Sequence, residues 1–264
     1  MSDNPFRVVA GTGHRRLEHG DRAWVSGQLP RAAAWLRDHA GTEVGISGLG
    51  YDLDLEWGEA ILDAGLTLWV AIPFEEHALD WDDDSLRRWR RLRAAAAPDG
   101  ERLVGRLPRN LPPARRRSYV AQLMHARNRA MLARAGAVLA VWEPGRLDGG
   151  TAATLLHAAH RGMPGVHLDP VARAVNFHLP GVDQLQKLTL EHTDCGHILA
   201  VGARADVEPR HAVLTAAGYP AWRIRPGQYR DRRDTAGCDR CRIDLDRWRA
   251  AARELFPQSG ENGR

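Results

Sequence analysis

The sequence predicts an α/β protein: a Rossmann-like, doubly wound parallel sheet followed by a small C-terminal α+β domain. In the first 170 residues, short apolar runs alternate with helical segments, which is typical of parallel strands joined by crossover helices. The run Ala137–Val141 is apolar throughout, as expected of a strand buried on both faces. The pattern changes after Gly181, so we expect a Rossmann-like domain over residues 1–175 and a small domain over residues 176–264.

The elements of the first domain are bounded by turn residues. Gly65 is a natural end for one helix, and Pro73 ends the strand that follows it. The expected strands, each a short apolar run, are Arg7–Ala10, Thr42–Ile46, Leu66–Ile72, Arg102–Leu107, Ala137–Val141 and Gly165–Leu168. The expected helices are Asp21–His39, Asp52–Ala64, Asp80–Arg93, Arg115–Ala135 and one that begins near Asp148.

The C-terminal domain shows shorter elements around its cysteines. The expected strands are Leu185–Leu190, Ile198–Val201 and Ala221–Ile224, and the expected helices are Pro209–Ala217 and Asp244–Leu255.

Composition excludes several classes of protein. Among 264 residues, 44% are hydrophobic and 27% charged, as in ordinary globular domains. No apolar run approaches the roughly 18 residues that a membrane span needs. The N-terminus lacks the basic and apolar regions of a signal peptide, so we expect a cytoplasmic protein without membrane association. The net charge of +4 is carried almost entirely by arginine and is too mixed with acidic residues to demand a nucleic-acid partner.

The strongest phosphate candidate is Gly149-Gly150-Thr151, a turn that opens a helix. Glycine permits close backbone approach, and the first N–H groups of a helix lack intrahelical partners. Three other segments are expected at the same edge of the sheet, because they end strands or flank them. These further ligand candidates are Gly11, Thr12, Gly13, His14 and Arg15 after the first strand, Ser47 and Gly48 after the second, and Arg127 and Asn128 on a helix.

Arg127 falls on the apolar face of its helix with Leu123 and Met131. A buried arginine is costly unless it is paired or reaches a polar cleft, which favours a ligand role. The alternative is a snorkelling side chain at a surface margin.

Three carboxylates lie close enough to this edge to be catalytic candidates. They are Glu143, Asp148 and Asp54. Asp54 is also favoured simply by its place in the first turn of a helix, and neither Glu143 nor Asp148 has a positioned partner visible in the sequence.

The first 170 residues resemble the SLOG superfamily, a Rossmann-like group that includes DprA, YpsA-like proteins and the cytokinin-activating phosphoribohydrolases. The resemblance is strongest to the YpsA-like and DprA-like proteins. Four pieces in order carry it: Gly11–Arg15, Ile46–Gly48 with Asp54 and Glu59, Pro73-Phe74 with Trp81, and Asn128 through Gly149-Gly150-Thr151 to Asp169-Pro170. Gly50-Tyr51-Asp52 stands where the family often has Ala-Leu-Gly, and His77 stands where Gln is usual.

The resemblance implies a nucleotide or nucleotide-derived ligand, which the protein would sense or process. It does not establish an enzyme. The phosphoribohydrolases carry a catalytic Glu after their glycine turn, and the segment Asp148–Thr154 has none, which puts hydrolysis of an N-glycosidic bond in doubt. The alternatives are single-stranded nucleic-acid binding of the DprA type, along Arg87–Arg93, Arg115–Arg117 and Arg230–Arg233, and an interaction scaffold with a vestigial pocket.

All three cysteines lie in the C-terminal domain, where Cys195, His197, Cys238 and Cys241 predict a structural zinc site, with His192 as the alternative fourth ligand. Four protein ligands leave no open position for catalysis. Reduced cysteines without metal, or a redox pair, remain open. We expect this domain to contact a protein partner or cover the cleft, and a homo-oligomer is compatible with the sequence.

Overall fold

The computed structural model describes residues 4–216, 218 and 221–226. The chain divides into two compact units, Met1–Val182 and Asp183–Arg264, each described here by itself. The helix Asp244–Leu255 expected from the sequence lies outside the described residues. Among the described helices, none is long and apolar enough to cross a membrane.

The first unit is built on a seven-stranded sheet in the order β4-β3-β2-β1-β5-β6-β7. Every neighbouring pair is parallel except β6 and β7. The strands are β1 (Val8–Gly13), β2 (Val44–Ser47), β3 (Thr67–Ile72), β4 (Glu101–Leu103), β5 (Ala137–Val141), β6 (Gly165–Asp169) and β7 (Ala174–Asn176). The predicted Rossmann-like α/β fold is therefore confirmed for this unit.

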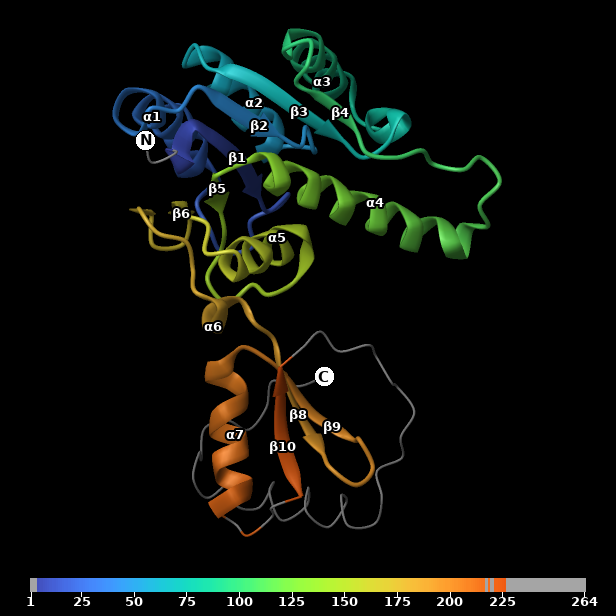
Figure 1. The fold of residues 1–264 in the computed structure, drawn as a ribbon. Helices are drawn as coiled ribbons and strands as arrows, with labels where there is room; N and C mark the ends of the chain where they lie inside the picture. Colours follow the sequence, from blue (N-terminus) through green and yellow to red (C-terminus); the bar gives the residue numbers. More distant parts are fainter. Residues whose placement is uncertain (1–3, 217, 219–220, 227–264) are drawn as a thin grey trace. The chain divides into compact units, whose positions relative to one another are not determined.

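Helices cover both faces of the sheet (Figure 1). The chain first moves outward from β1 to β4 and then returns to the other side of β1, so right-handed crossovers place the early and late helices on opposite faces. The early layer contains α1 (Arg22–Ala40), α2 (Leu53–Asp63) and α3 (Asp83–Ala95), and the late layer contains α4 (Pro113–Arg134) and α5 (Gly149–His160). Two short 3-10 helices are Pro5–Arg7 and Glu75–Ala78.

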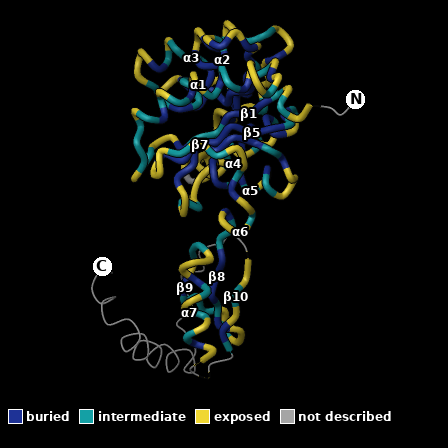
Figure 2. Tube along the Cα trace, turned by 90° about the vertical axis from the view of Figure 1, so that its left-hand side faces the viewer, coloured by how far each residue is buried: buried dark blue, intermediate teal, exposed yellow. Residues whose placement is uncertain are grey.

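Burial is greatest in the central strands (Figure 2). All residues of β5 and β6 are buried, as the apolar run at β5 predicted. Two of the helices begin with a side-chain cap: in α1, Asp21 accepts a hydrogen bond from the Trp24 amide, and in α3, Asp82 accepts one from the Ser85 amide.

Several boundaries differ from the sequence prediction. The strand β4 ends at Leu103 instead of Leu107, and β1 continues through Gly13 instead of ending at Ala10. The antiparallel strand β7 was not predicted, because three residues carry too little periodicity; it extends the first sheet past residue 175, where we expected the domain boundary.

The described part of the second unit is α+β. A three-stranded antiparallel sheet in the order β10-β8-β9 packs its apolar residues against a helix. Its elements are α6 (Val182–Leu185), β8 (Leu188–His192), β9 (Ile198–Gly202), α7 (Arg204–Ala216) and β10 (Trp222–Pro226). The helix α7 begins at Arg204, five residues before the predicted start at Pro209.

Candidate functional site

The candidate site lies at the carboxyl edge of the sheet, where the strand order reverses between β1 and β5. In open α/β sheets this switch point leaves a crevice, because the loops of neighbouring strands leave in opposite directions. His14 follows β1 directly, and its amide donates a hydrogen bond to the Val141 carbonyl at the end of β5 (3.3 Å).

Arg127 of α4 reaches into this crevice with only 8% of its surface exposed. Its Nη1 donates to the Gly48 carbonyl (2.8 Å) and to Oδ2 of Asp54 (3.0 Å), and its Nε donates to Oδ1 of Asn128 (2.9 Å). The arginine on the apolar helix face is thus paired inside a polar cleft and does not snorkel to a surface margin.

Asn128 fastens α4 to the first turn of α5. Its Nδ2 donates to Oγ1 of Thr154 (2.7 Å) and, at 3.3 Å, to the Gly150 carbonyl. Thr154 in turn donates to that carbonyl (2.6 Å). Thr154 was not among the predicted site residues. Its spacing of one helical turn from Gly150 is the sequence feature that could have indicated this contact.

The start of α5 is the part of the site most open to an anion. Gly149 and Gly150 are exposed, whereas Thr151 is buried. Gly149 has φ +88°, a conformation that favours glycine, and the Asp148 side chain makes no capping hydrogen bond. The first amides of α5 therefore receive no capping hydrogen bond from the Asp148 side chain, and this end of the helix is exposed.

Three of the candidate glycines, Gly11, Gly13 and Gly48, make room for neighbouring side chains. A Cβ at Gly11 would overlap the Trp57 indole, and one at Gly48 would overlap the Arg127 guanidinium. A Cβ at Gly13 would press on Leu53 and Val141. Gly11–Gly13 belong to β1, so they are strand residues beside which neighbouring side chains pack, and Gly11 and Thr12 line the cleft. Their contact with a phosphate stays a prediction.

The Ser47 side chain makes hydrogen bonds within the loop that follows β2. It is fully buried, donates to the Asp54 carbonyl (2.6 Å) and accepts from the Leu49 amide (3.1 Å). Leu49 has φ +43°, and the Asp54 carboxylate accepts from the Gly50 amide at 3.1 Å. These contacts hold the strained loop in which Arg127 is anchored.

Two imidazoles, the buried His14 and the half-buried His77, each have a buried Nε2 atom. The Nε2 atoms of His14 and His77 have no hydrogen-bond partner within the described residues. Burial lowers the pKa of His14 to about 4, helped by the charge of Arg146. Burial also lowers the pKa of His77 to about 3, with further effects from Arg127 and Arg15, so both rings are neutral at pH 7.

His77 was not among the predicted ligand residues, and its only signal in the sequence is that it stands where the resembled family usually has Gln. The ring packs edge-on against Phe74 and Trp81, with Tyr51 beyond Trp81. This aromatic cluster lies close enough to Arg127 and to the exposed Arg15 for their charges to lower the pKa of His77.

Glu143 holds a loop together. Only 2% exposed, it accepts hydrogen bonds from the amides of Glu18, His19 and Gly20 and pairs with Arg146 at 2.9 Å. Burial opposes its ionisation, but these hydrogen bonds outweigh burial and lower its pKa to about 2. A carboxylate so occupied is a poor general base.

Beneath the rim the cleft is narrow. The cavity lined by Thr12, Asp54, Arg127, Asn128 and Thr154 measures ≈ 10 Å³, about the room for one water molecule. A ligand larger than a water molecule therefore fits only outside this cavity or by displacing Arg127.

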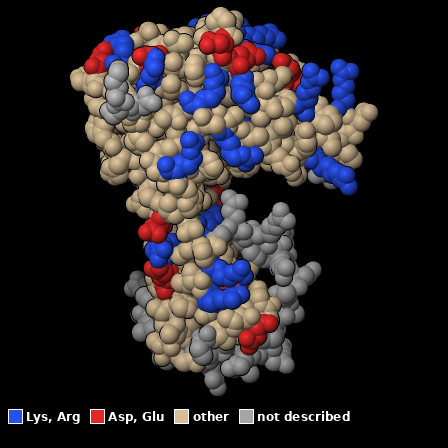
Figure 3. Space-filling view, in the orientation of Figure 1, with Lys and Arg blue, Asp and Glu red and all other residues tan. Residues whose placement is uncertain are grey.

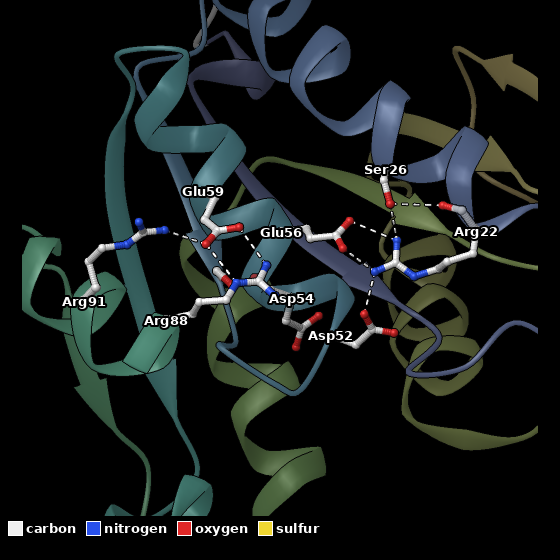
Figure 4. A network of polar contacts seen from close by, with 9 residues as sticks. Arg22, Ser26, Asp52, Asp54, Glu56, Glu59, Arg88 and Arg91 are labelled. Carbon is white, nitrogen blue, oxygen red and sulfur yellow. Dashed lines mark hydrogen bonds and ion pairs between the residues drawn. The ribbon is translucent and has the colours of Figure 1, made fainter. Parts of the chain in front are cut away.

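Ion pairs on both sides of α2 fix the helix that carries Asp54 (Figure 4). Arg22 of α1 pairs with Asp52 (2.5 Å) and with Glu56. On the other side, Glu59 pairs with Arg88 and Arg91 of α3 (2.7 and 2.6 Å). Glu59, part of the family resemblance, is thus a structural ion-pair partner in this chain.

The predicted zinc ligands are only partly covered by the structure. Cys195 Sγ lies 3.5 Å from Nδ1 of the buried His192, whereas Cys238 and Cys241 lie outside the described residues. The described residues alone contain no group of three or more potential metal ligands. The ring centre of His197 lies 6.4 Å from that of Trp222, whereas the ring centre of His192 lies 5.1 Å from it.

No protein-family model matches this sequence, and no curated protein matches it. Among solved structures, the chain is similar to DNA processing protein A (DprA) from Streptococcus pneumoniae, with 17% sequence identity and a TM-score of 0.31. The similarity covers 62% of this chain and 60% of that one, so the chain matches less than two thirds of the DprA chain.

Proposed function

We propose that the first unit binds a nucleotide or nucleotide-derived ligand at the carboxyl edge of its sheet. The phosphate would lie on the uncapped amides of α5 near Arg15, and the ring system against the wall of Tyr51 and Trp81. The observation that carries this proposal is the buried pair Arg127 and Asn128: the Arg127 guanidinium contacts the loop after β2, and the Asn128 amide contacts the start of α5. His14 and His77 each add a buried Nε2 atom without a hydrogen-bond partner among the described residues. Buried polar atoms without partners are rare and are commonly satisfied by a ligand or water.

Binding is favoured over hydrolysis. Asp54 is paired with Arg127, and Glu143 is bound by backbone amides, so neither is poised to activate water. Asp148, exposed at the start of α5, is the remaining carboxylate candidate for an N-glycosidic reaction.

The test uses thermal shift and calorimetry with the four 5′-nucleoside monophosphates and the matching nucleosides. We expect at least one monophosphate to stabilise the protein more than its nucleoside does. Gly150→Glu places a carboxylate at the exposed start of α5 and should weaken that binding at least about tenfold, because a charge-assisted contact becomes a repulsion.

His157→Glu is the matched control, since it adds the same charge to an exposed position farther along α5. It should bind the monophosphate as the parent does. Equal responses of the parent and Gly150→Glu would refute the site. If no nucleotide raises the melting temperature, the interaction scaffold with a vestigial pocket becomes the better interpretation.

A second candidate function, single-stranded nucleic-acid binding, is favoured by a basic segment that contains no acidic residue from Arg102 to Trp142. Figure 3 shows blue side chains gathered over the region of β4 and α4. Seven arginines of this segment are exposed and form no ion pair within the described residues: Arg102, Arg106, Arg109, Arg115, Arg116, Arg117 and Arg129.

The arginines of α3 are less suited to this role than the sequence indicated. Arg87, Arg88, Arg91 and Arg93 all pair with carboxylates, which offset their charge. Arg230–Arg233 lie outside the described residues. The β4–α4 segment is therefore the best candidate for a backbone-binding track.

Fluorescence anisotropy with a 30-nucleotide single strand tests this function. Replacing Arg115, Arg116 and Arg117 by Gln should reduce the slope of log affinity against log salt by about 2, because each lost phosphate contact removes roughly 0.7. The control replaces Arg87, Arg88 and Arg91 by Gln and should change the slope less. Undetectable binding by the parent at low ionic strength would eliminate this function.

For the second unit, we propose a structural zinc ion bound by His192, Cys195, Cys238 and Cys241. Two adjacent ligands of a tetrahedral zinc ion, at about 2.3 Å for sulfur and 2.0–2.1 Å for nitrogen, are separated by about 3.5 Å. The distance between Cys195 Sγ and His192 Nδ1 matches this value and favours His192 over His197 as the nitrogen ligand. Bound zinc would add folding free energy to a unit with a small core.

A further inference from the structure

A second cavity of ≈ 240 Å³ lies between α1 and the β6–β7 end of the sheet. It shares no lining residue with the cleft at the carboxyl edge. The helix α1 is the last of its layer, so the sheet face beside it, at β6 and β7, is left as an open groove.

The groove is apolar on three sides. Val166 and Leu168 of β6 form a buried floor, and Ala32 and Trp35 of α1 form one wall. Phe177 follows β7 and is 61% exposed, and its ring contacts that of Trp35, with 4.8 Å between the ring centres. Exposed aromatic surface of this kind commonly marks a binding site.

The size of the cavity suits a small aromatic molecule. An apolar cavity of about 150 Å³ takes a single benzene ring, so ≈ 240 Å³ accommodates a substituted or fused ring. The tilted rings of Trp35 and Phe177 offer edge and face contacts to such a ligand ring.

One side of the groove carries a positive charge. Arg31 lines the cavity, is exposed, and forms no ion pair with the described residues. Gln28, one helical turn earlier, lines the same side and adds an amide donor. A ligand with an apolar body and one anionic group would match both features.

We propose that this groove is a binding site for an aromatic carboxylate. The ring packs against the contacting rings of Trp35 and Phe177 over the floor of the groove, and the carboxylate faces Arg31 at the rim.

Two fluorescent dyes test the site in the full chain. The first is 8-anilinonaphthalene-1-sulfonate, which combines an aromatic body with one negative charge, and the second is its uncharged relative N-phenyl-1-naphthylamine. Ala32→Trp fills the cavity and Phe177→Ala removes a wall, so both should weaken both dyes, by about threefold to tenfold for the loss of one aromatic contact. Arg31→Gln should weaken only the charged dye, by about twofold to fivefold.

Matched controls separate these effects from general ones. Ala23→Trp adds the same ring at an exposed position of α1, Arg90→Gln removes an exposed charge from α3, and Gly150→Glu alters only the nucleotide cleft. All three should bind both dyes as the parent does. Phe177 is mostly exposed, so Phe177→Ala keeps the proposal testable if Ala32→Trp does not fold.

Unchanged dye binding in Ala32→Trp and Phe177→Ala, or loss of binding in Gly150→Glu, would overturn the proposal. So would sedimentation showing that the parent is a dimer and Phe177→Ala a monomer, because a second copy of the chain would then cover the groove.

Discussion

Single glycines illustrate how one residue type can serve different physical purposes. Gly11 and Gly48 lack a Cβ so that Trp57 and Arg127 can approach the backbone, while Gly149 adopts a positive φ at the start of α5. In the sequence all three look alike, as small residues next to predicted turns. Only the neighbours that a Cβ would meet distinguish packing from ligand access.

Asp52 lies in a backbone conformation that favours glycine, with φ 71° and ψ −108°. Asp52→Gly and Asp52→Ala both lose the contact with Arg22, which keeps Glu56 as a partner. Because only glycine relieves the strain, we expect Asp52→Gly to be more stable than Asp52→Ala by about 1 kcal/mol in urea unfolding. Equal stabilities would show that the loop imposes no strain here.

Acid should destabilise the first unit through the imidazoles of His14 and His77. The pKa values of His14 and His77 are about 4 and about 3 in the folded protein, below the 6.5 of the unfolded chain. The unfolded state therefore binds more protons below pH 6.5, and the free energy of unfolding falls as pH falls. Between pH 7 and 5 each ring should remove about 1–2 kcal/mol of stability.

The measurement is urea unfolding at pH 7 and pH 5 for the parent and His77→Gln. The variant should lose less stability over this interval, because its amide does not titrate. Glu143 does not confound the comparison, since its pKa is about 2 when folded and about 4.5 when unfolded, so its stabilising contribution is lost only below pH 4.5. A pH dependence identical to that of the parent would show that His77 is not buried as a neutral ring.

At the scale of elements, prediction succeeded where a segment carried its own periodicity or boundary signal. The strand β5 matches the predicted range, and α1 begins after the Asp21 cap and ends at Gly41 in the left-handed conformation. The strand predicted at β4 was too long, and β7 was not predicted. Both strands have three residues and depend on pairing with a neighbouring strand. β1 extends past Ala10 because it pairs with β5 through Gly13, a contact between segments far apart in sequence.

At the scale of the whole molecule, two units with separate cores should respond to different ligands. We expect a strong chelator to lower the melting temperature of the C-terminal unit, because zinc affinity contributes directly to its folding. Calorimetry with and without chelator measures this, and the transition of the first unit should be unchanged. His192→Ala should abolish zinc retention in metal analysis, whereas His197→Ala should not; zinc-free purified protein would contradict the proposal.

The sequence by itself determined the α/β class, most strand positions and the edge of the sheet where a site should lie, because these depend on local periodicity and on the rule that loops follow parallel strands at one edge. Only the tertiary structure decided what each candidate residue does there. Glu143 accepts hydrogen bonds from amides far away in sequence, and Gly11 makes room for Trp57, whereas Arg127 and Asn128 line the cleft. The physical reason is that burial, unmet hydrogen bonds and overlap are properties of neighbours in space, which a linear pattern does not contain.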